Sequence, residues 1–393
     1  MRSLLYNRFT AVTTAAAIAA LTFTGCGSAP GTDLPEASEE TSVQTESSVE
    51  EMTAQEAPVQ IAEEKTEETS KTGTVTVGDD NASVKIGMVT DTAGINDHSF
   101  NQSAWDGLLF LNDNLNARVS YIPAAGTDEF VADLSRLADE GNDVCWGIGY
   151  QFADAILDAA EMYPDKHFAI VDYMFDEIPD NVTCAMFNAE EPSFLVGYIA
   201  GRCTQSGKVG FVGGMDVEAL HAFQYGYMAG VEQADSETGG STEVLCEYIG
   251  TFDDAAKGRQ VAEAMYDEGC DVIFHAAGGA GVGVIEAAAD MDKYVIGVDC
   301  DQSYLAPGNV LTSAVKKVDV IVSNISVQYG MGDNIGGRMI KYGLKEHAVG
   351  IPDEHPLVSD EIYDAAKALE QKIMFGGLEV PFDEASYDAF SPQ

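Results

Sequence analysis

Basic side chains are scarce in this chain. Its 393 residues include 20 Lys and Arg against 65 Asp and Glu, which gives a formal net charge of -45 at pH 7. Carboxylates in such excess repel phosphate backbones, and without a basic patch there is no counterion release to drive nucleic-acid binding. The composition therefore argues against a DNA- or RNA-binding protein.

Several motifs of enzymes and metal sites are also missing. The sequence has no GxSxG nucleophile elbow, no HExxH pair and no CxxC pair. Nucleophilic hydrolases, zinc proteases and many metal or redox sites depend on such spacings. We therefore expect no catalytic residue, no metal and no cofactor. Beyond Cys26, most cysteines are expected to be free thiols, with one disulfide as the alternative: Cys145, Cys184, Cys203, Cys246, Cys270 and Cys300.

The first 25 residues have the pattern of an export signal. Arg2 and Arg8 precede an apolar stretch from Ala11 to Phe23, which is too short to span a bilayer comfortably as a helix. It ends in Phe-Thr-Gly-Cys, which resembles the lipobox of bacterial lipoproteins with Phe where Leu is usual. That resemblance implies a lipid on Cys26 and anchoring at the membrane. An ordinary secretory signal with an incidental cysteine is the alternative.

The next segment contains no aromatic residue. From Gly27 to Ser83 there is no Phe, Trp or Tyr, and Glu, Ser, Thr, Ala, Pro and Gln dominate. Such a segment buries too little apolar surface to offset its ordering entropy, and glutamate pairs such as Glu39-Glu40 make it self-repelling. Residues 26–83 are therefore predicted to be a disordered acidic tether. A binding site for a basic partner is the alternative.

Beyond Ser83, short β-branched runs alternate with helical patterns. Strands are predicted at Val84–Thr90, Val119–Pro123, Asp143–Ile148, Phe168–Asp172, Lys208–Val212, Val244–Tyr248, Val272–His275, Tyr294–Val298 and Val310–Val315. Helices are predicted at Asn101–Asn112, Thr127–Asp139, Phe152–Met162, Pro192–Thr204, Ala219–Ala234, Ala255–Glu268 and Val282–Asp290.

This alternation indicates an α/β fold with parallel sheets covered by helices on both faces. About 300 residues exceed what one core usually supports, so two similar lobes are expected rather than one open sheet. In such sheets ligands bind beyond the carboxyl ends of the strands. The site should therefore lie in the cleft between the lobes.

A polar loop with one aromatic residue follows the first predicted strand. Asp91 ends the strand, and Asp97 and Asn101 are among the side chains that offer helix caps or ligand contacts. Phe100 lies among them. Its ring is either a staple onto the following helix or a platform for a flat ligand, and periodicity does not separate the two.

A second aromatic candidate lies on a helix of the second lobe. Phe223, Tyr227 and Val231 recur at spacings of four and share one helix face. All three could be core. If Phe223 instead faces the cleft, it could sandwich a planar ring against Phe100.

The glycine-rich segment FHAAGGAGVGVIEAA imitates a dinucleotide fingerprint. However, Gly279, Gly281 and Gly283 have GxGxG spacing, and Asp299 and Asp301 would repel a phosphate. These glycines are expected instead to let the backbone approach an uncharged ligand, with carboxylates such as Asp299 accepting hydrogen bonds from its hydroxyls. Lys316 could complete this cluster or be a solvated surface lysine.

These segments together resemble the basic membrane protein family, which comprises purine-nucleoside-receptor-like substrate-binding lipoproteins of ABC importers. The resemblance is carried, in order, by GMVTDTAGINDHSFNQSAWDGL, DVCWGIGYQFADAI, PSFLVGYIAGR, VGFVGGMD, FHAAGGAGVGVIEAA, GVDCDQSYLAPG and LTSAVKKVD. It implies a type I periplasmic-binding-protein fold, with two lobes joined by three hinge strands that close on a nucleoside. The lobes are expected to comprise residues 84–187 with 315–345, and 188–314 with 346–393.

The resemblance also implies roles for individual residues. Phe100 and Phe223 take the positions where the family stacks the purine. Asp91, Asn101 and Asp172 match its polar contacts near the ligand.

On the ribose side, Gly279, Asp299 and Lys316 match the family. Tyr150 stands where the family often has Phe, which keeps stacking possible and adds a hydroxyl. Cys300 replaces the more usual Ser beside Asp299.

The resulting hypothesis is a monomeric, lipid-anchored receptor on the extracytoplasmic face of the cell membrane that delivers a purine nucleoside to an ABC permease. Three alternatives stay open. The chain could be a ligand-sensing lipoprotein that signals to a membrane partner, a receptor for another small molecule such as a sugar, or a nucleoside hydrolase that uses the Asp cluster. The sensor would bind its ligand in the same way as the receptor, whereas the hydrolase would consume it.

Overall fold

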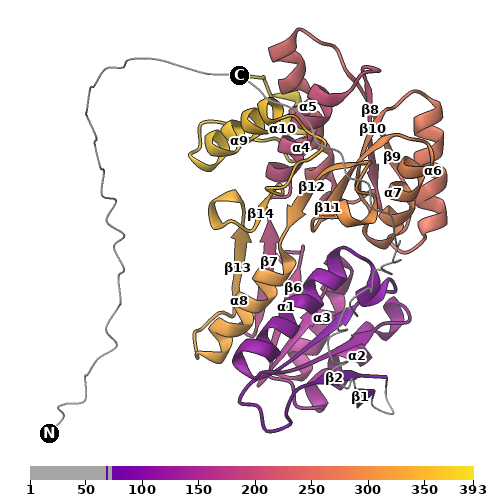
Figure 1. The fold of residues 1–393 in the computed structure, drawn as a ribbon. Helices are drawn as coiled ribbons and strands as arrows, with labels where there is room; N and C mark the ends of the chain where they lie inside the picture. Colours follow the sequence, from indigo (N-terminus) through magenta and orange to yellow (C-terminus); the bar gives the residue numbers. More distant parts are fainter. Residues whose placement is uncertain (1–67, 70–72) are drawn as a thin grey trace, which may run out of the picture. The chain divides into compact units, whose positions relative to one another are not determined.

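The protein is described by a computed structural model, which covers residues 68–69 and 73–393 (Figure 1). The predicted signal peptide, Cys26 and most of the predicted tether lie outside the described residues. In the part of the chain that is described, no helix is long and apolar enough to cross a membrane.

The first sheet has the strand order β1-β2-β4-β3-β5-β6-β7-β13. Its strands are β1 Glu68–Thr69, β2 Val75–Val77, β3 Lys85–Thr90, β4 Arg118–Pro123, β5 Val144–Gly147, β6 His167–Val171, β7 Val182–Phe187 and β13 Arg338–Tyr342. All neighbours from β4 to β13 pair in parallel, and only β1 and β2 are antiparallel.

Helices cover both faces of this sheet. They are α1 Phe100–Leu115, α2 Phe130–Asp139, α3 Ala153–Met162 and α8 Val318–Gly330. Successive residues of β3 alternate between the two faces: Met88 packs in the cluster that contains α1 and α8, and Val89 in the cluster that contains α2 and α3. Because both faces are buried, strands such as β6 read as continuous apolar runs.

The second sheet has the order β14-β12-β11-β10-β8-β9, in which only β14 is antiparallel. Its strands are β8 Lys208–Gly213, β9 Glu243–Tyr248, β10 Val272–Ala276, β11 Tyr294–Asp299, β12 Val310–Lys316 and β14 Val349–Gly350. The helices of this half are α4 Glu190–Cys203, α5 Glu218–Thr238, α6 Ala255–Asp267, α7 Gly281–Asp290, α9 Asp360–Met374 and α10 Glu384–Asp388.

The chain passes between the two sheets three times. The passages lead from β7 to α4, from β12 to α8 and from β13 to β14. We call the first sheet with α1, α2, α3 and α8 the first lobe, and the second sheet with its helices the second lobe (Figure 1). The prediction of an α/β fold with two mostly parallel sheets is confirmed.

The folded part begins earlier than predicted. Residues 73–83 were expected to belong to the disordered tether, but Val75–Val77 form β2, which pairs antiparallel with β4. Val75 and Val77 are buried, as is Thr74. The prediction is wrong for this stretch because a short Thr-Val-Thr-Val run can bury its valines once a partner strand is present, even in a polar sequence without aromatic residues.

Every predicted strand and helix is present, with ends shifted by a few residues. The strands and α-helices that were not predicted are β1, β2, β7, β13, β14, α8, α9 and α10. Most of them lie after residue 316, where strands and helices no longer alternate regularly. All six cysteines of residues 73–393 are free.

Candidate ligand-binding site

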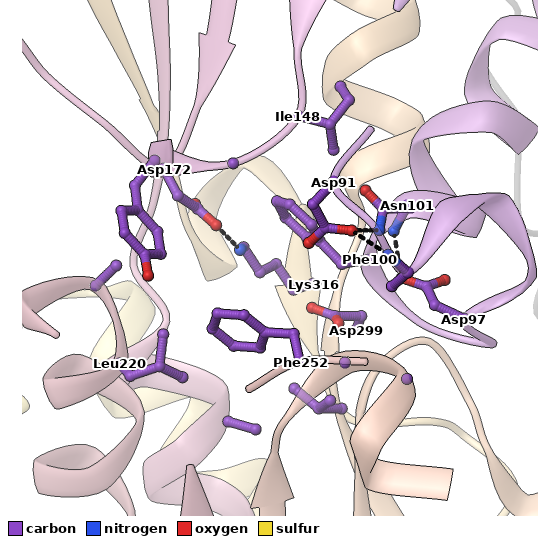
Figure 2. Close-up of a pocket in the computed structure, with 18 of the residues that line it drawn as sticks. Asp91, Asp97, Phe100, Asn101, Ile148, Asp172, Leu220, Phe252, Asp299 and Lys316 are labelled. Carbon is purple, nitrogen blue, oxygen red and sulfur yellow. Dashed lines mark hydrogen bonds and ion pairs between the residues drawn. The ribbon is translucent and has the colours of Figure 1, made fainter. Parts of the chain in front are cut away.

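A cavity lies between the two lobes, at the carboxyl ends of their strands. It encloses about 640 Å³ between the surrounding atoms, part of it open to solvent. The first lobe contributes residues that follow β3, β5 and β6. The second contributes α5, a residue that follows β9, and residues at or just after the ends of β10, β11 and β12. Figure 2 shows these side chains converging on the cavity from both sides.

All ten residues predicted for the site line this cavity. They are Asp91, Asp97, Phe100, Asn101, Tyr150, Asp172, Phe223, Gly279, Asp299 and Lys316. The residues that sequence reasoning missed are Ala93, Ile148, Gly149, Gln151, Ala219, Leu220, Phe252, Ala276, Gly278 and Val298. Phe252 is the most prominent of them. It lies in the loop after β9, which ends at Tyr248, so the same strand-end rule could have found it.

The two aromatic candidates meet at the cavity, although each also packs against the core. Phe100 is the first residue of α1 and is partly buried against the main hydrophobic cluster. On α5, Tyr227 and Val231 are buried in that cluster, whereas Phe223, on the same helix face, reaches the cavity wall. On this helix face, Tyr227 and Val231 are therefore core residues, whereas Phe223 belongs both to the core and to the wall of the cleft.

Asp97 stabilises the start of α1. Its carboxylate accepts hydrogen bonds from the backbone N–H groups of Ser99, Asn101 and Gln102, at 3.0, 2.8 and 3.0 Å. Burial raises the pKa of Asp97, and these bonds oppose that shift. Because both carboxylate oxygens accept hydrogen bonds from N–H groups at the start of α1, Asp97 fixes the conformation of the loop that leads to Phe100.

Asp91 and Asn101 form a polar pair on the first-lobe side. Asn101 Nδ2 donates to Asp91 Oδ1 at 2.8 Å, and the backbone N–H of Ala93 donates to the same oxygen at 3.0 Å. Burial raises the pKa of Asp91 to about 6 against these two hydrogen bonds, and the nearby Asp97 carboxylate adds to the rise. The pKa of Asp91 therefore lies above the usual range of an aspartate.

Lys316 is the basic side chain that lines the cavity, and it is only 2% exposed. It is not a solvated surface lysine. Its ammonium pairs with Asp172 of the first lobe and lies 4.5 Å from the ring centroid of Phe100, 4.8 Å from that of Phe187 and 5.7 Å from that of Phe223. A desolvated ammonium against several aromatic faces is favourable, so Lys316 links both lobes at the centre of the site.

Asp299 lies at the end of β11 in the left-handed backbone region, with φ of 65°. Burial raises its pKa to about 6, while Lys316 and a hydrogen bond from the Ser99 hydroxyl favour the ionised form. Asp172 at the end of β6 has a similar φ of 63°. Non-glycine residues in this region are uncommon and are often found at functional sites.

The glycine-rich segment has two different roles. Gly278 and Gly279 line the cavity, and a Cβ added to Gly279 would lie 3.3 Å from the carbonyl oxygen of Phe252. A Cβ added to Gly281 would lie 2.2 Å from the His275 ring, and one added to Gly283 would lie 1.8 Å from the Ala255 carbonyl oxygen. The expectation that these glycines admit a ligand is wrong for Gly281 and Gly283, which allow close packing of α7 on its neighbours.

This packing predicts a stability effect. Gly283→Ala is expected to destabilise the protein by about 1–3 kcal/mol, because the new methyl group overlaps backbone atoms at the start of α6. The control is Gly308→Ala, at a position with nothing within 4 Å of an added Cβ. Thermal unfolding should show a lower Tm for Gly283→Ala alone, and equal Tm values for both variants would contradict the packing role.

The family model described as "ABC transporter substrate-binding protein PnrA-like", named Bmp, matches residues 84–384. The chain belongs to the Bmp family. The resemblance drawn from the sequence is therefore confirmed, and the protein is a member of a substrate-binding family of ABC transporters, which implies a small-molecule ligand and a permease partner.

The similarity of this Bmp-family chain to individual relatives covers nearly the whole length of those relatives. Basic membrane protein D of Borreliella burgdorferi is 39% identical over 314 residues, which cover 78% of this chain and 90% of that protein. The CD4+ T-cell-stimulating antigen of Listeria innocua is 37% identical over 329 residues, covering 77% and 90%.

Solved structures agree on the architecture. An ABC transporter solute-binding protein from Aeropyrum pernix has a TM-score of 0.71 at 25% identity and covers 78% of this chain and 96% of its own. A second solute-binding protein, from Conexibacter woesei, has a TM-score of 0.62 at 24% identity and covers 77% and 100%. These likenesses are consistent with a type I periplasmic-binding fold.

Proposed function

We propose that this protein is a lipid-anchored receptor on the extracytoplasmic face of the membrane that binds a purine nucleoside between its lobes and delivers it to an ABC permease. One observation carries the ligand assignment. Phe100 of the first lobe and Phe223 of the second line the same cavity as four carboxylates, of which Asp97 and Asp299 are buried. Flat faces together with hydrogen-bond acceptors suit a heterocycle joined to a sugar.

Each side of the cavity has a part in this proposal. The base stacks between Phe100 and Phe223, and its edge meets the Asp91–Asn101 pair. The ribose lies against Gly279, and its hydroxyls donate to Asp299. Tyr150 and Phe252 add aromatic surface at the rim of the base.

The charges of the cavity favour a neutral ligand. Asp91, Asp97, Asp172 and Asp299 line it together with the ammonium of Lys316, which is already paired with Asp172. A phosphate would add negative charge beside these carboxylates in a partly desolvated space, where like charges repel strongly. Nucleosides should therefore bind and nucleotides should not.

In this proposal, ligand binding and lobe closure are sufficient for delivery to the permease, and no reaction of the ligand is needed. A ligand that contacts both lobes shifts an open ensemble toward the closed one, and a permease can recognise the closed arrangement. Among the described residues that line the cavity, none is a Ser, Cys or His, so a hydrolase would have to rely on the Asp carboxylates, to which we assign hydrogen bonding with the ligand. We propose that the protein acts as a monomer and releases its ligand unchanged.

The test is calorimetric titration of the full-length protein, denatured and refolded to remove carried-over ligand. The panel contains adenosine, guanosine, inosine, cytidine, uridine, the free bases and adenosine monophosphate. Tight binding of purine nucleosides, with weak or no binding of the monophosphate and with intact ligand recovered afterwards, supports the proposal. Binding of a sugar alone, or conversion of the nucleoside to base and ribose, contradicts it.

A further inference from the structure

Several hydrogen bonds join the two lobes around the cavity, and most begin in the loop between β3 and α1. Thr92 Oγ1 donates to Asp253 Oδ2 at 2.6 Å, and His98 Nδ1 lies 3.0 Å from the hydroxyl of Tyr304. At the end of the same loop, the hydroxyl of Ser99 donates to Asp299 Oδ2. Of these three contacts, the Ser99–Asp299 bond is the one that reaches a residue of the cavity wall.

Ser99 does not use its hydroxyl to cap α1. It occupies the cap position before that helix, where serine commonly accepts a hydrogen bond from the helix backbone, yet its side chain makes no such bond. Asp97 provides the cap instead. Ser99 is 1% exposed, and an unbonded hydroxyl at such a position would be costly, so the bond to Asp299 satisfies it.

The bond also leaves Asp299 in a defined state. Asp299 is 6% exposed, its backbone is held in the left-handed region, and Ser99 engages one of its two carboxylate oxygens. Within residues 73–393, the other oxygen, Oδ1, accepts no hydrogen bond. A carboxylate fixed in this way has one oxygen available to a ligand hydroxyl without first losing rotamer freedom.

We propose that Ser99 is a positioning residue that orients the Asp299 carboxylate for the ribose of the ligand, and does so only when the lobes are closed. The inference rests on the proposed function, because it takes Asp299 as the ribose acceptor. Ser99 lies in the first lobe and Asp299 in the second, so a lobe opening that separates these two residues would break the bond. Recognition of the sugar is thereby coupled to lobe closure.

The experiment compares Ser99→Ala with Ser99→Thr, which keeps a hydroxyl, and with Thr92→Val, which removes a different bond between the lobes. Each variant of the full-length protein is titrated with adenosine and with adenine, and its folding is checked by thermal unfolding. Ser99→Ala should lower the adenosine-to-adenine affinity ratio by about 10-fold, the size expected for a hydrogen bond to a charged group. Ser99→Thr should keep the ratio largely intact. Thr92→Val should weaken both ligands alike or neither.

The pH dependence of adenosine affinity is a second measurement, and a purely structural role of Ser99 would leave it unchanged. The groups that face Asp299 are Asp97 and Asp172, which disfavour its ionised form, and Lys316 and Ser99, which favour it; Cys300 and Asp301 follow it in the chain. Without the hydroxyl, ionised Asp299 loses a donor. The pH below which adenosine affinity falls should therefore lie higher in Ser99→Ala than in the parent protein.

The possible outcomes distinguish a failure of the Ser99 role from a failure of the proposed function. If the parent protein prefers adenosine to adenine and Ser99→Ala keeps both that preference and its pH dependence, the role of Ser99 is refuted and the proposed function stands. If Thr92→Val lowers the adenosine-to-adenine affinity ratio as much as Ser99→Ala does, then Ser99 only helps to hold the lobes together. That result would also overturn the proposal. If the parent protein does not distinguish adenosine from adenine, the ribose role of Asp299 fails and the inference fails with it.

Discussion

Asp299→Ala is expected to lower affinity for purine nucleosides by about 100-fold while leaving affinity for free bases nearly unchanged. The buried Asp299 carboxylate is the proposed acceptor for ribose hydroxyls, and its loss removes charge-assisted hydrogen bonds that form in a desolvated space. A 100-fold change corresponds to about 2.7 kcal/mol. Lys316 keeps its partner Asp172 in this variant, so the substitution does not leave an unpaired buried ammonium.

Titration of adenosine and adenine against the same protein preparation measures this difference. Asp299→Asn serves as the matched variant, because it keeps the shape of the side chain and removes its charge. It should show a smaller but still ribose-selective loss. Equal losses for adenosine and adenine in Asp299→Ala would refute the assigned role.

The same carboxylate should make binding depend on pH. Burial raises the pKa of Asp299 to about 6, and the ionised form is the one that accepts hydrogen bonds from a ribose. As the pH falls through about 6, protonation competes with binding, so nucleoside affinity should decline there and be highest above it. Asp91, whose pKa is also about 6, contributes a similar decline, and in Asp299→Ala only this second part should remain.

Phe100→Ala and Phe223→Ala are each expected to weaken purine binding by about 10-fold or more. Stacking of a base on an aromatic side chain contributes about 1–3 kcal/mol, and the two rings come from opposite lobes. The losses should be similar for nucleosides and free bases, because stacking involves the base alone. This pattern distinguishes the two phenylalanines from Asp299.

Phe375→Ala is the control for these variants, since Phe375 is 82% exposed and does not line the cavity. It should leave the titration curves unchanged. Each variant needs a thermal unfolding curve, because Phe100 and Phe223 also pack against the core. Unchanged purine affinity in both cavity variants would rule out the stacked arrangement.

Much of the fold could be predicted from the sequence because its signals are local. Runs such as the buried β6, His167–Val171, are apolar along their whole length, and the helices between strands show helical periodicity. Asp91 and Asp299 lie at or just after the ends of predicted strands, so the rule that ligands bind there already pointed to them, whereas Asp172 was named only through the family resemblance. β7 and the elements after Lys316 were missed because strand and helix no longer alternate there.

The amino-acid sequence by itself determined the alternation of strands and helices, the acidic character of the chain and the residues at the strand ends. Only the tertiary structure decided what those residues touch. It assigned Asp97 to the helix cap and Gly283 to helix packing, and it brought Ser99 to Asp299 across 200 positions of sequence. The physical reasons differ. The backbone conformation of the loop decides that Asp97 caps α1, and the packing of α7 on α6 decides the role of Gly283. The Ser99–Asp299 contact depends on how the two lobes lie relative to each other, which local sequence patterns do not encode.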